Sequence, residues 1–168
     1  MKRIIQISLA LAAIITAYIA AGPYLTLNNI KASLIENNPA KLAENIDFPL
    51  LRQNLKEQIN AAMLTNASEN TENPFALLAA GLVTVMTEKL VEGLLTPNGM
   101  AAAFGKENAN SKDELFQDAK INFESISVVS ILIPGENNIE TRMILQREGI
   151  TWKLTNVILP DISAATQQ

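Results

Sequence analysis

Residues 121–159 read INFESISVVSILIPGENNIETRMILQREGITWKLTNVIL, and apolar residues alternate with other residues along most of this stretch. A period of two residues is typical of β-strands, and turn sequences at 134–138 and 148–149 interrupt it. The pattern predicts an antiparallel meander of three strands, which span residues 121–133, 139–147 and 151–159. Because Glu148-Gly149 leaves almost no connecting chain, the last two strands are expected to form a tight hairpin.

The faces of the predicted strands differ in polarity. The first strand has apolar residues on both faces, so it is expected to be buried at least partly on both sides. In the second strand, Met143 and Leu145 share the apolar face. In the third strand, the expected apolar face holds Trp152, Leu154 and Ile158.

The chain before residue 120 has helical periodicity instead, because apolar residues recur at steps of three and four. A capping residue precedes a proline at four predicted helix starts, which are Asn38-Pro39, Asp47-Phe48-Pro49, Asn73-Pro74 and Thr96-Pro97. An earlier helix begins near residue 24. The five helices are expected to end near residues 36, 45, 65, 95 and 104. The polar stretches 66–73 and 105–118 are predicted loops, with Gly105 at the end of the last helix.

Helices followed by a meander indicate an α+β fold. A three-stranded antiparallel sheet can bury one face only if helices lie across it, so several helices are expected to pack on the sheet. A strongly curved, cone-like sheet wrapped around helices is one such solution.

Residues 4–22, IIQISLALAAIITAYIAAG, form a long apolar run. As a helix, these residues would span about 28 Å, close to the roughly 30 Å hydrocarbon core of a bilayer. No charge occurs between Arg3 and Lys31, so placing the run in lipid desolvates no ionised group. Lys2 and Arg3 precede the run, and the positive-inside rule places the rest of the chain on the exported side. We expect a transmembrane helix, an exported α+β domain and a flexible tail at residues 1–22, 23–160 and 161–168.

Two interpretations of this segment stay open, a retained signal-anchor and a cleaved signal peptide. The run is longer than the usual signal-peptide core of about 7–15 residues, which favours the anchor. The cleavage sites after residues 20 and 21 have Tyr18 and Ile19 at the minus-three position, where a small residue is needed. Cleavage after Gly22 would put Pro23 immediately downstream. Pro23 is also expected to interrupt the apolar helix.

The composition excludes several classes of function. The chain has no His and no Cys, so it can form neither a Ser-His-Asp or Cys-His nucleophile nor a His/Cys zinc or haem site. With 13 basic and 17 acidic residues, the net charge of −4 gives no electrostatic footprint for nucleic acid. We therefore assign no catalytic residue and expect no metal site, no cofactor and no nucleic-acid partner.

The stretch at residues 73–87 carries no charge, yet it is shorter than the roughly 18 residues that span a bilayer. One interpretation is a central helix buried in the core. The other is a stripe that contacts an apolar ligand or a partner, formed by Phe75, Leu78, Leu82 and Met86.

Acidic residues are the remaining candidates for a site. Asp47 stands at a predicted helix start, where its carboxylate can cap the helix or contact a ligand. Glu88 and Glu92 lie four residues apart on one predicted helix face, as a general acid and base would. An exposed charged edge of an amphipathic helix has the same spacing.

Two stretches carry a resemblance to a known family. Residues 23–61 read PYLTLNNIKASLIENNPAKLAENIDFPLLRQNLKEQINA, and residues 149–160 read GITWKLTNVILP. Together with the apolar N-terminus, they resemble the bacterial domain of unknown function 2939 family of exported or membrane-anchored proteins. The resemblance implies a location in the bacterial envelope, and it implies no reaction, ligand or catalytic residue.

These observations favour a non-enzymatic module, anchored in the bacterial inner membrane by a single pass, with its C-terminal domain in the periplasm. Its expected partners are the membrane, through the N-terminal helix, and an envelope protein or an apolar ligand such as a lipid. The rival hypothesis is a small envelope enzyme or lipid-handling protein with a pocket between helices and sheet. If the signal is cleaved, the domain would instead be secreted to the periplasm.

Overall fold

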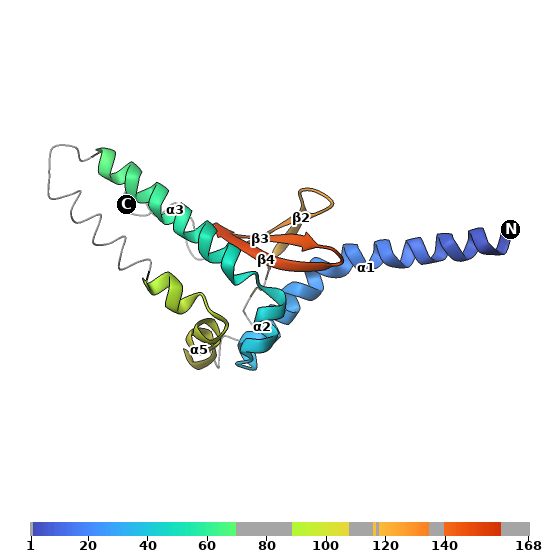
Figure 1. Ribbon diagram of the computed structural model, residues 1–168, viewed down its shortest axis with the longest axis horizontal. Helices are drawn as coiled ribbons and strands as arrows, with labels where there is room; N and C mark the ends of the chain where they lie inside the picture. Colours follow the sequence, from blue (N-terminus) through green and yellow to red (C-terminus); the bar gives the residue numbers. More distant parts are fainter. Residues whose placement is uncertain (1, 70–88, 108–115, 117, 135–139, 159–168) are drawn as a thin grey trace.

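The computed structural model describes residues 2–69, 89–107, 116, 118–134 and 140–158. Its helices are α1 (Lys2–Ile35), α2 (Pro39–Asn45), α3 (Phe48–Glu69) and α5 (Pro97–Glu107), and residues 89–94 are also helical. Its strands are β1 (Lys120–Phe123), β2 (Val128–Pro134), β3 (Glu140–Glu148) and β4 (Thr151–Ile158). The predicted α+β fold is confirmed. Figure 1 shows the N-terminal half of α1 extending away from the domain, while α3 runs along β4.

The sheet has four antiparallel strands in the order β1-β2-β3-β4, one more than predicted. The single strand expected at residues 121–133 is two strands joined by a turn. In that turn the backbone N–H groups of Glu124 and Ser125 both donate to the carbonyl of Val128. The Ser125 hydroxyl accepts from the N–H of Ser127 at 3.2 Å. A serine that bonds to nearby backbone competes with the strand ladder, which explains why the strand breaks here.

A β-bulge in β4 changes which residues face the core. Leu154 pairs with Leu145 and Asn156 pairs with Ile144, so no residue of β3 stands opposite Thr155 in the register. The alternation of side chains shifts by one residue after the bulge. Val157 therefore packs against the core, whereas Ile158, which we expected there, is exposed. Trp152 and Leu154 are buried as expected.

The hairpin between β3 and β4 is confirmed, and Gly149 occupies its first central position with a φ of 62°. Replacing Gly149 with alanine is expected to destabilise the protein by about 1–2 kcal/mol, because an L side chain is strained at positive φ. Gly93→Ala is the control, since an added Cβ there meets no atom within 4 Å and its φ is not positive. Urea denaturation of the detergent-solubilised protein measures both, and equal stability of the two variants would contradict the prediction.

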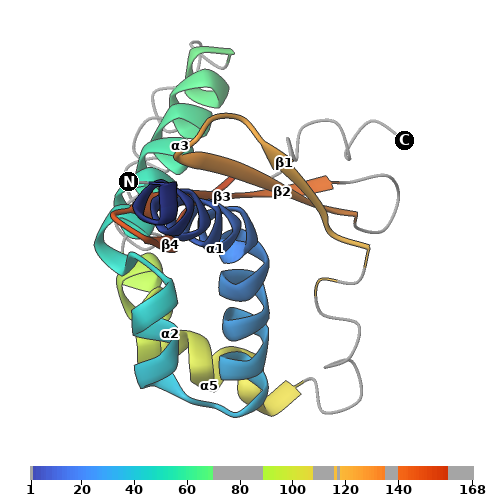
Figure 2. The same cartoon turned by 90° about the vertical axis from the view of Figure 1, so that its right-hand side faces the viewer.

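Helix α1 continues through Pro23, contrary to the expectation that this residue separates two helices. Figures 1 and 2 show the two halves of α1 running in different directions. Proline bends a helix because it lacks an N–H and its ring clashes with the carbonyl four residues earlier. From Arg3 to Ala21 the side chains are exposed apart from Ile19, and Gly22 and Pro23 begin the half that packs in the domain.

Two other helix ends differ from the predictions. Helix α3 extends to Glu69 rather than ending near residue 65, and α5 extends to Glu107, which places Gly105 inside the helix. Helix ends are the least determined boundaries of a pattern-based assignment. The predicted helix over residues 74–95 lies mostly outside the described residues.

The core lies between one face of the sheet and the helices α1, α2, α3 and α5. Figure 2 shows the second half of α1 beside α2, on the same side of the sheet. The core cluster draws on α1, α2, α3, α5, β2, β3 and β4, and on Ile46 between α2 and α3. Its buried apolar side chains are Ile30, Leu34, Leu42, Ile46, Phe48, Leu51, Ala101, Val129, Ile131, Met143, Leu145, Trp152 and Leu154.

Candidate functional site

The first half of α1 has the surface of a membrane-spanning helix. The helix is long and apolar enough to cross a bilayer, and none of its most apolar window is buried within the protein. A core helix of a soluble domain would be covered, so the segment is consistent with a single-pass anchor or a signal peptide. The hydroxyl of Thr16 donates to the carbonyl of Ala12 at 2.9 Å, which satisfies this polar group inside the helix. A polar group surrounded by lipid needs such an internal partner.

The apolar first half of α1 meets the domain at a joint formed by Ile19, Gly22, Pro23 and Trp152. In a regular helix the N–H of residue 23 would donate to the carbonyl of Ile19, but proline has no N–H. The indole Nε1–H of Trp152 donates to this carbonyl instead, at 3.1 Å. The strand β4 thus supplies the hydrogen bond that the proline removes from α1.

Gly22 provides the space for the indole. A Cβ built on Gly22 would overlap Cδ1 of Trp152 and lie 2.6 Å from its Nε1, far inside van der Waals contact. Gly22 and Pro23 are both buried, and Trp152 is 2% exposed. A side chain at position 22 is therefore incompatible with the observed packing.

Two further contacts hold Trp152 in the joint. The hydroxyl of Thr26, one turn after Gly22 on α1, donates to the Trp152 carbonyl at 3.1 Å. The ring of Phe123 on β1 meets the indole edge to face, with centroids 6.3 Å apart and planes at 89°. The indole thus contacts α1 on one side and a second strand on the other, which fixes the direction in which the apolar helix leaves the domain.

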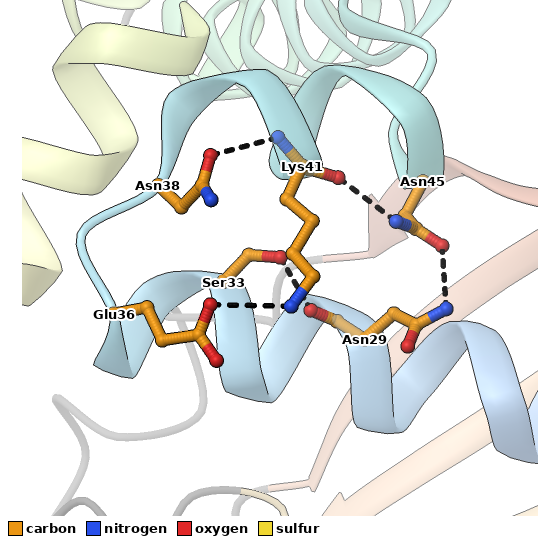
Figure 3. A network of polar contacts seen from close by, with 6 residues as sticks. All are labelled: Asn29, Ser33, Glu36, Asn38, Lys41 and Asn45. Carbon is orange, nitrogen blue, oxygen red and sulfur yellow. Dashed lines mark hydrogen bonds and ion pairs between the residues drawn. The ribbon is translucent and has the colours of Figure 1, made fainter.

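The second half of α1 is joined to α2 by a polar network (Figure 3). The amide of Asn29 donates to Oδ1 of Asn45 at 3.4 Å, and Nζ of Lys41 lies 3.1 Å from the carboxylate of Glu36. Asn38 caps α2 by accepting from the N–H of Lys41 at 3.1 Å. The ion pair is half exposed, and pairs of this kind contribute about 0–1 kcal/mol. The network therefore has a structural role, which is to link the two helices.

The outer edge of β4 is covered by groups from α3 and the chain before it. The N–H of Asp47 donates to the carbonyl of Leu154 at 2.9 Å, and Nδ2 of Asn54 donates to that of Thr155 at 2.8 Å. Nε2 of Gln58 donates to the carbonyl of Val157 at 3.0 Å. The backbone groups of an exposed strand edge can pair with a strand of another chain. These contacts occupy the edge of β4 and so oppose such pairing.

The carboxylate of Asp47 also accepts from the N–H of Leu50 at 3.1 Å, at the start of α3. Asp47→Ala is expected to destabilise the protein by about 0.5–2 kcal/mol through loss of this cap. Asp47→Asn keeps an accepting oxygen and is expected to retain most of the stability. Denaturation midpoints of the three proteins measure the effect. A loss as large in the asparagine variant would show that the negative charge, and not the capping bond, matters.

The predicted contact stripe lies outside the described residues, and its members are Phe75, Leu78, Leu82 and Met86. Glu88, the first half of the proposed acid-base pair, also lies outside them. Glu92 is exposed and its carboxylate lies 2.8 Å from Nζ of Lys56. The hydrogen bond and the charge of Lys56 lower the pKa of Glu92, whereas a general acid needs a raised pKa.

Among the described residues, no group of three or more acidic side chains is arranged to hold a metal ion. The joint at Trp152 combines a buried indole donor, a carbonyl left free by proline and close contact with glycine. It was not predicted, because Pro23 marks only where a carbonyl loses its partner, and the sequence does not say which distant donor replaces it.

Comparison with known proteins gives one match. No curated protein and no solved structure matches the chain significantly. The model of the family described as Protein of unknown function (DUF2939) matches residues 12–103, which is more than half of the chain. The match includes Gly22, Pro23 and the Asp47-Phe48-Pro49 helix start, while the strand with Trp152 falls outside it. The chain therefore belongs to the DUF2939 family.

Proposed function

We propose that the protein is a single-pass membrane protein of the bacterial inner membrane, with its α+β domain in the periplasm and its N-terminal helix retained as an anchor. One observation carries the proposal: α1 runs without a break from its exposed apolar half into the core of the domain. A helix that belongs to both parts acts as a stiff connection, in contrast to the flexible linkers between an anchor and a mobile domain.

The joint argues for retention of the helix. Cleavage at residues 20–22 would remove Ile19, whose carbonyl accepts the indole N–H of Trp152. The mature domain would then lose the acceptor of this indole N–H, and a hydrogen bond of this kind contributes about 0.5–1.5 kcal/mol. Retention keeps this donor satisfied.

The distribution of charge supports the proposed orientation. Lys2 and Arg3 are the only charged side chains before the apolar run, and the positive-inside rule keeps them in the cytoplasm. After residue 22 the chain has 11 basic and 17 acidic residues. This excess of acidic residues does not favour a domain that binds anionic lipid headgroups through its overall charge.

We propose a binding role for the domain, directed at an envelope protein or an apolar ligand. The fixed joint would present this module to the membrane in one orientation. In the described residues, the lysines of three ion pairs contact Glu36, Glu92 and Glu148, so these carboxylates serve surface pairs and not a common site. Crosslinking in the intact envelope, followed by identification of the neighbours, tests the role. A deletion strain that loses a specific turnover, restored only by the purified protein, would contradict it.

The topology has a direct test. A reporter fused after Gln168 that functions only in the periplasm is expected to be active, and the purified protein is expected to retain its N-terminal residues in mass spectrometry. A mature N-terminus at residues 21–23 would show that the segment is a cleaved signal. Activity of a reporter that functions only in the cytosol would overturn the orientation.

A further inference from the structure

Two exposed isoleucines lie at the end of the sheet nearest to the first half of α1. Ile126 is 78% exposed in the turn between β1 and β2, and Ile150 is 61% exposed in the turn between β3 and β4. Figure 1 shows both turns on the side of the domain from which the N-terminal half of α1 extends. Exposure of large apolar side chains to water is unfavourable in free energy, and their burial in an apolar environment is favourable.

Arg147 ties the two turns together. Its Nε donates to the carbonyl of Ile126 at 3.2 Å, and its Nη1 donates to the carbonyl of Gly149 at 3.0 Å. Its backbone N–H donates to the carbonyl of Ser127 at 2.9 Å. The two isoleucines are therefore presented by one connected unit and not by independent loops.

The joint determines where along α1 the two turns lie. The bond between Trp152 and Ile19 lies within one turn of the end of the apolar run at residue 22. Ile150 precedes Trp152 by two residues, which is about 7 Å along a strand. Tyr18 and Tyr24 flank Ile19 and are both exposed, as is typical of aromatic residues at the headgroup level. If α1 spans a bilayer, the tips reach its outer boundary.

We infer that the turns carrying Ile126 and Ile150 insert into the outer interface of the bilayer that holds α1. The inference rests on the proposed function, because it requires α1 to span the membrane. With α1, the two tips would give the domain three points of contact and would fix its tilt and its rotation relative to the membrane.

Apolar contact, and not charge, drives the insertion. Near the tips, Arg147 and Lys153 are balanced by Glu124 and Glu148, and Lys153 is paired with Glu148 at 3.1 Å. Clusters of unpaired Lys and Arg, which would select anionic lipids, are therefore not present at these turns in the described structure. The inserted area is expected to bind zwitterionic and anionic bilayers equally.

Single-cysteine labelling of the full chain tests the inference, since the protein has no cysteine of its own. The variants Ile126→Cys and Ile150→Cys carry an environment-sensitive fluorophore in phosphatidylcholine nanodiscs with one copy each. Lipids spin-labelled near the headgroup quench a fluorophore at the interface. The matched control is Leu90→Cys, because Leu90 is also a large apolar residue that is 61% exposed, and it lies on the helical segment 89–94 away from the tips.

Both tip fluorophores are expected to be quenched about twofold or more above the Leu90 fluorophore, because interfacial segments lie about 5–10 Å into the headgroup boundary. Leu11→Cys reports on the anchor, and lipids spin-labelled deep in the acyl chain should quench it. Quenching at position 11 with tip values equal to the Leu90 value would overturn the inference and leave the anchor intact. No quenching at position 11 would overturn the proposed function as well. A strong dependence on added anionic lipid would overturn the apolar mechanism.

Discussion

Replacing Trp152 with alanine is expected to destabilise the domain by about 3–5 kcal/mol, the range for removal of a large buried aromatic side chain. The indole is 2% exposed, contacts Gly22 and the ring of Phe123, and donates to the carbonyl of Ile19. Its loss would therefore leave a cavity and an unpaired carbonyl at the same place. The unfolding transition in detergent, followed by far-ultraviolet circular dichroism, measures the change.

Trp152→Phe separates the hydrogen bond from the packing. Phenylalanine keeps an aromatic ring but has no N–H, so the carbonyl of Ile19 loses its partner at a cost of about 1–3 kcal/mol. The variant Pro23→Ala provides the matched background, because alanine restores the backbone N–H that bonds to Ile19 in a regular helix. In that background the Trp152→Phe cost is expected to shrink, and a double-mutant cycle measures the difference. Equal costs in the two backgrounds would show that the indole N–H does not substitute for the missing helical donor.

Much of the helical part could be predicted because its signals are local. Asn38 precedes a proline and Asp47 precedes a Phe-Pro step, and α2 and α3 begin at the residues directly after them. The hairpin at Gly149 was also predictable, since a tight turn needs a residue that accepts a positive φ. The apolar run before Pro23 required only its length and its lack of charge.

The errors in the sheet come from features that strand periodicity does not encode. The turn at residues 124–127 depends on backbone bonds to Val128, and in sequence only the two serines hint at it. The bulge at Thr155 depends on pairing with Ile144 and Leu145, and it puts Val157 against the core in place of Ile158, which was predicted there. A change in strand register moves side chains to the opposite face, so one unpaired residue was enough to place Ile158 wrongly.

The joint could not be predicted because its partners are more than 120 positions apart in the chain. A proline in an apolar helix indicates a carbonyl without a helical partner, and a lone tryptophan in a strand indicates a donor that needs an acceptor. Many other groups in a protein could serve as the hydrogen-bond partner of either one. Only the fold shows that the indole N–H of Trp152 and the free carbonyl of Ile19 bond to each other.

Gly22→Ala is expected to destabilise the domain by about 1–3 kcal/mol, the usual cost of inserting an extra methyl group into a well-packed site. Alanine favours a helix over glycine by about 1 kcal/mol, so a loss of stability would have to come from the tertiary contact with Trp152. Because Trp152 is the only tryptophan of the chain, its fluorescence reports directly on the joint. Displacement of the indole into a more polar environment should shift its emission to longer wavelength.

Two comparisons make this prediction specific to the joint. Gly93→Ala is also a helical substitution, but the added Cβ meets no atom within 4 Å, so it is expected to be neutral or stabilising by up to about 1 kcal/mol. In a Trp152→Ala background the clash at position 22 is gone, and Gly22→Ala should then behave like Gly93→Ala. If Gly22→Ala is as well tolerated as Gly93→Ala in the wild-type background, and the tryptophan emission does not move, the indole does not pack on Gly22. The apolar first half of α1 would then lack a rigid connection to the domain.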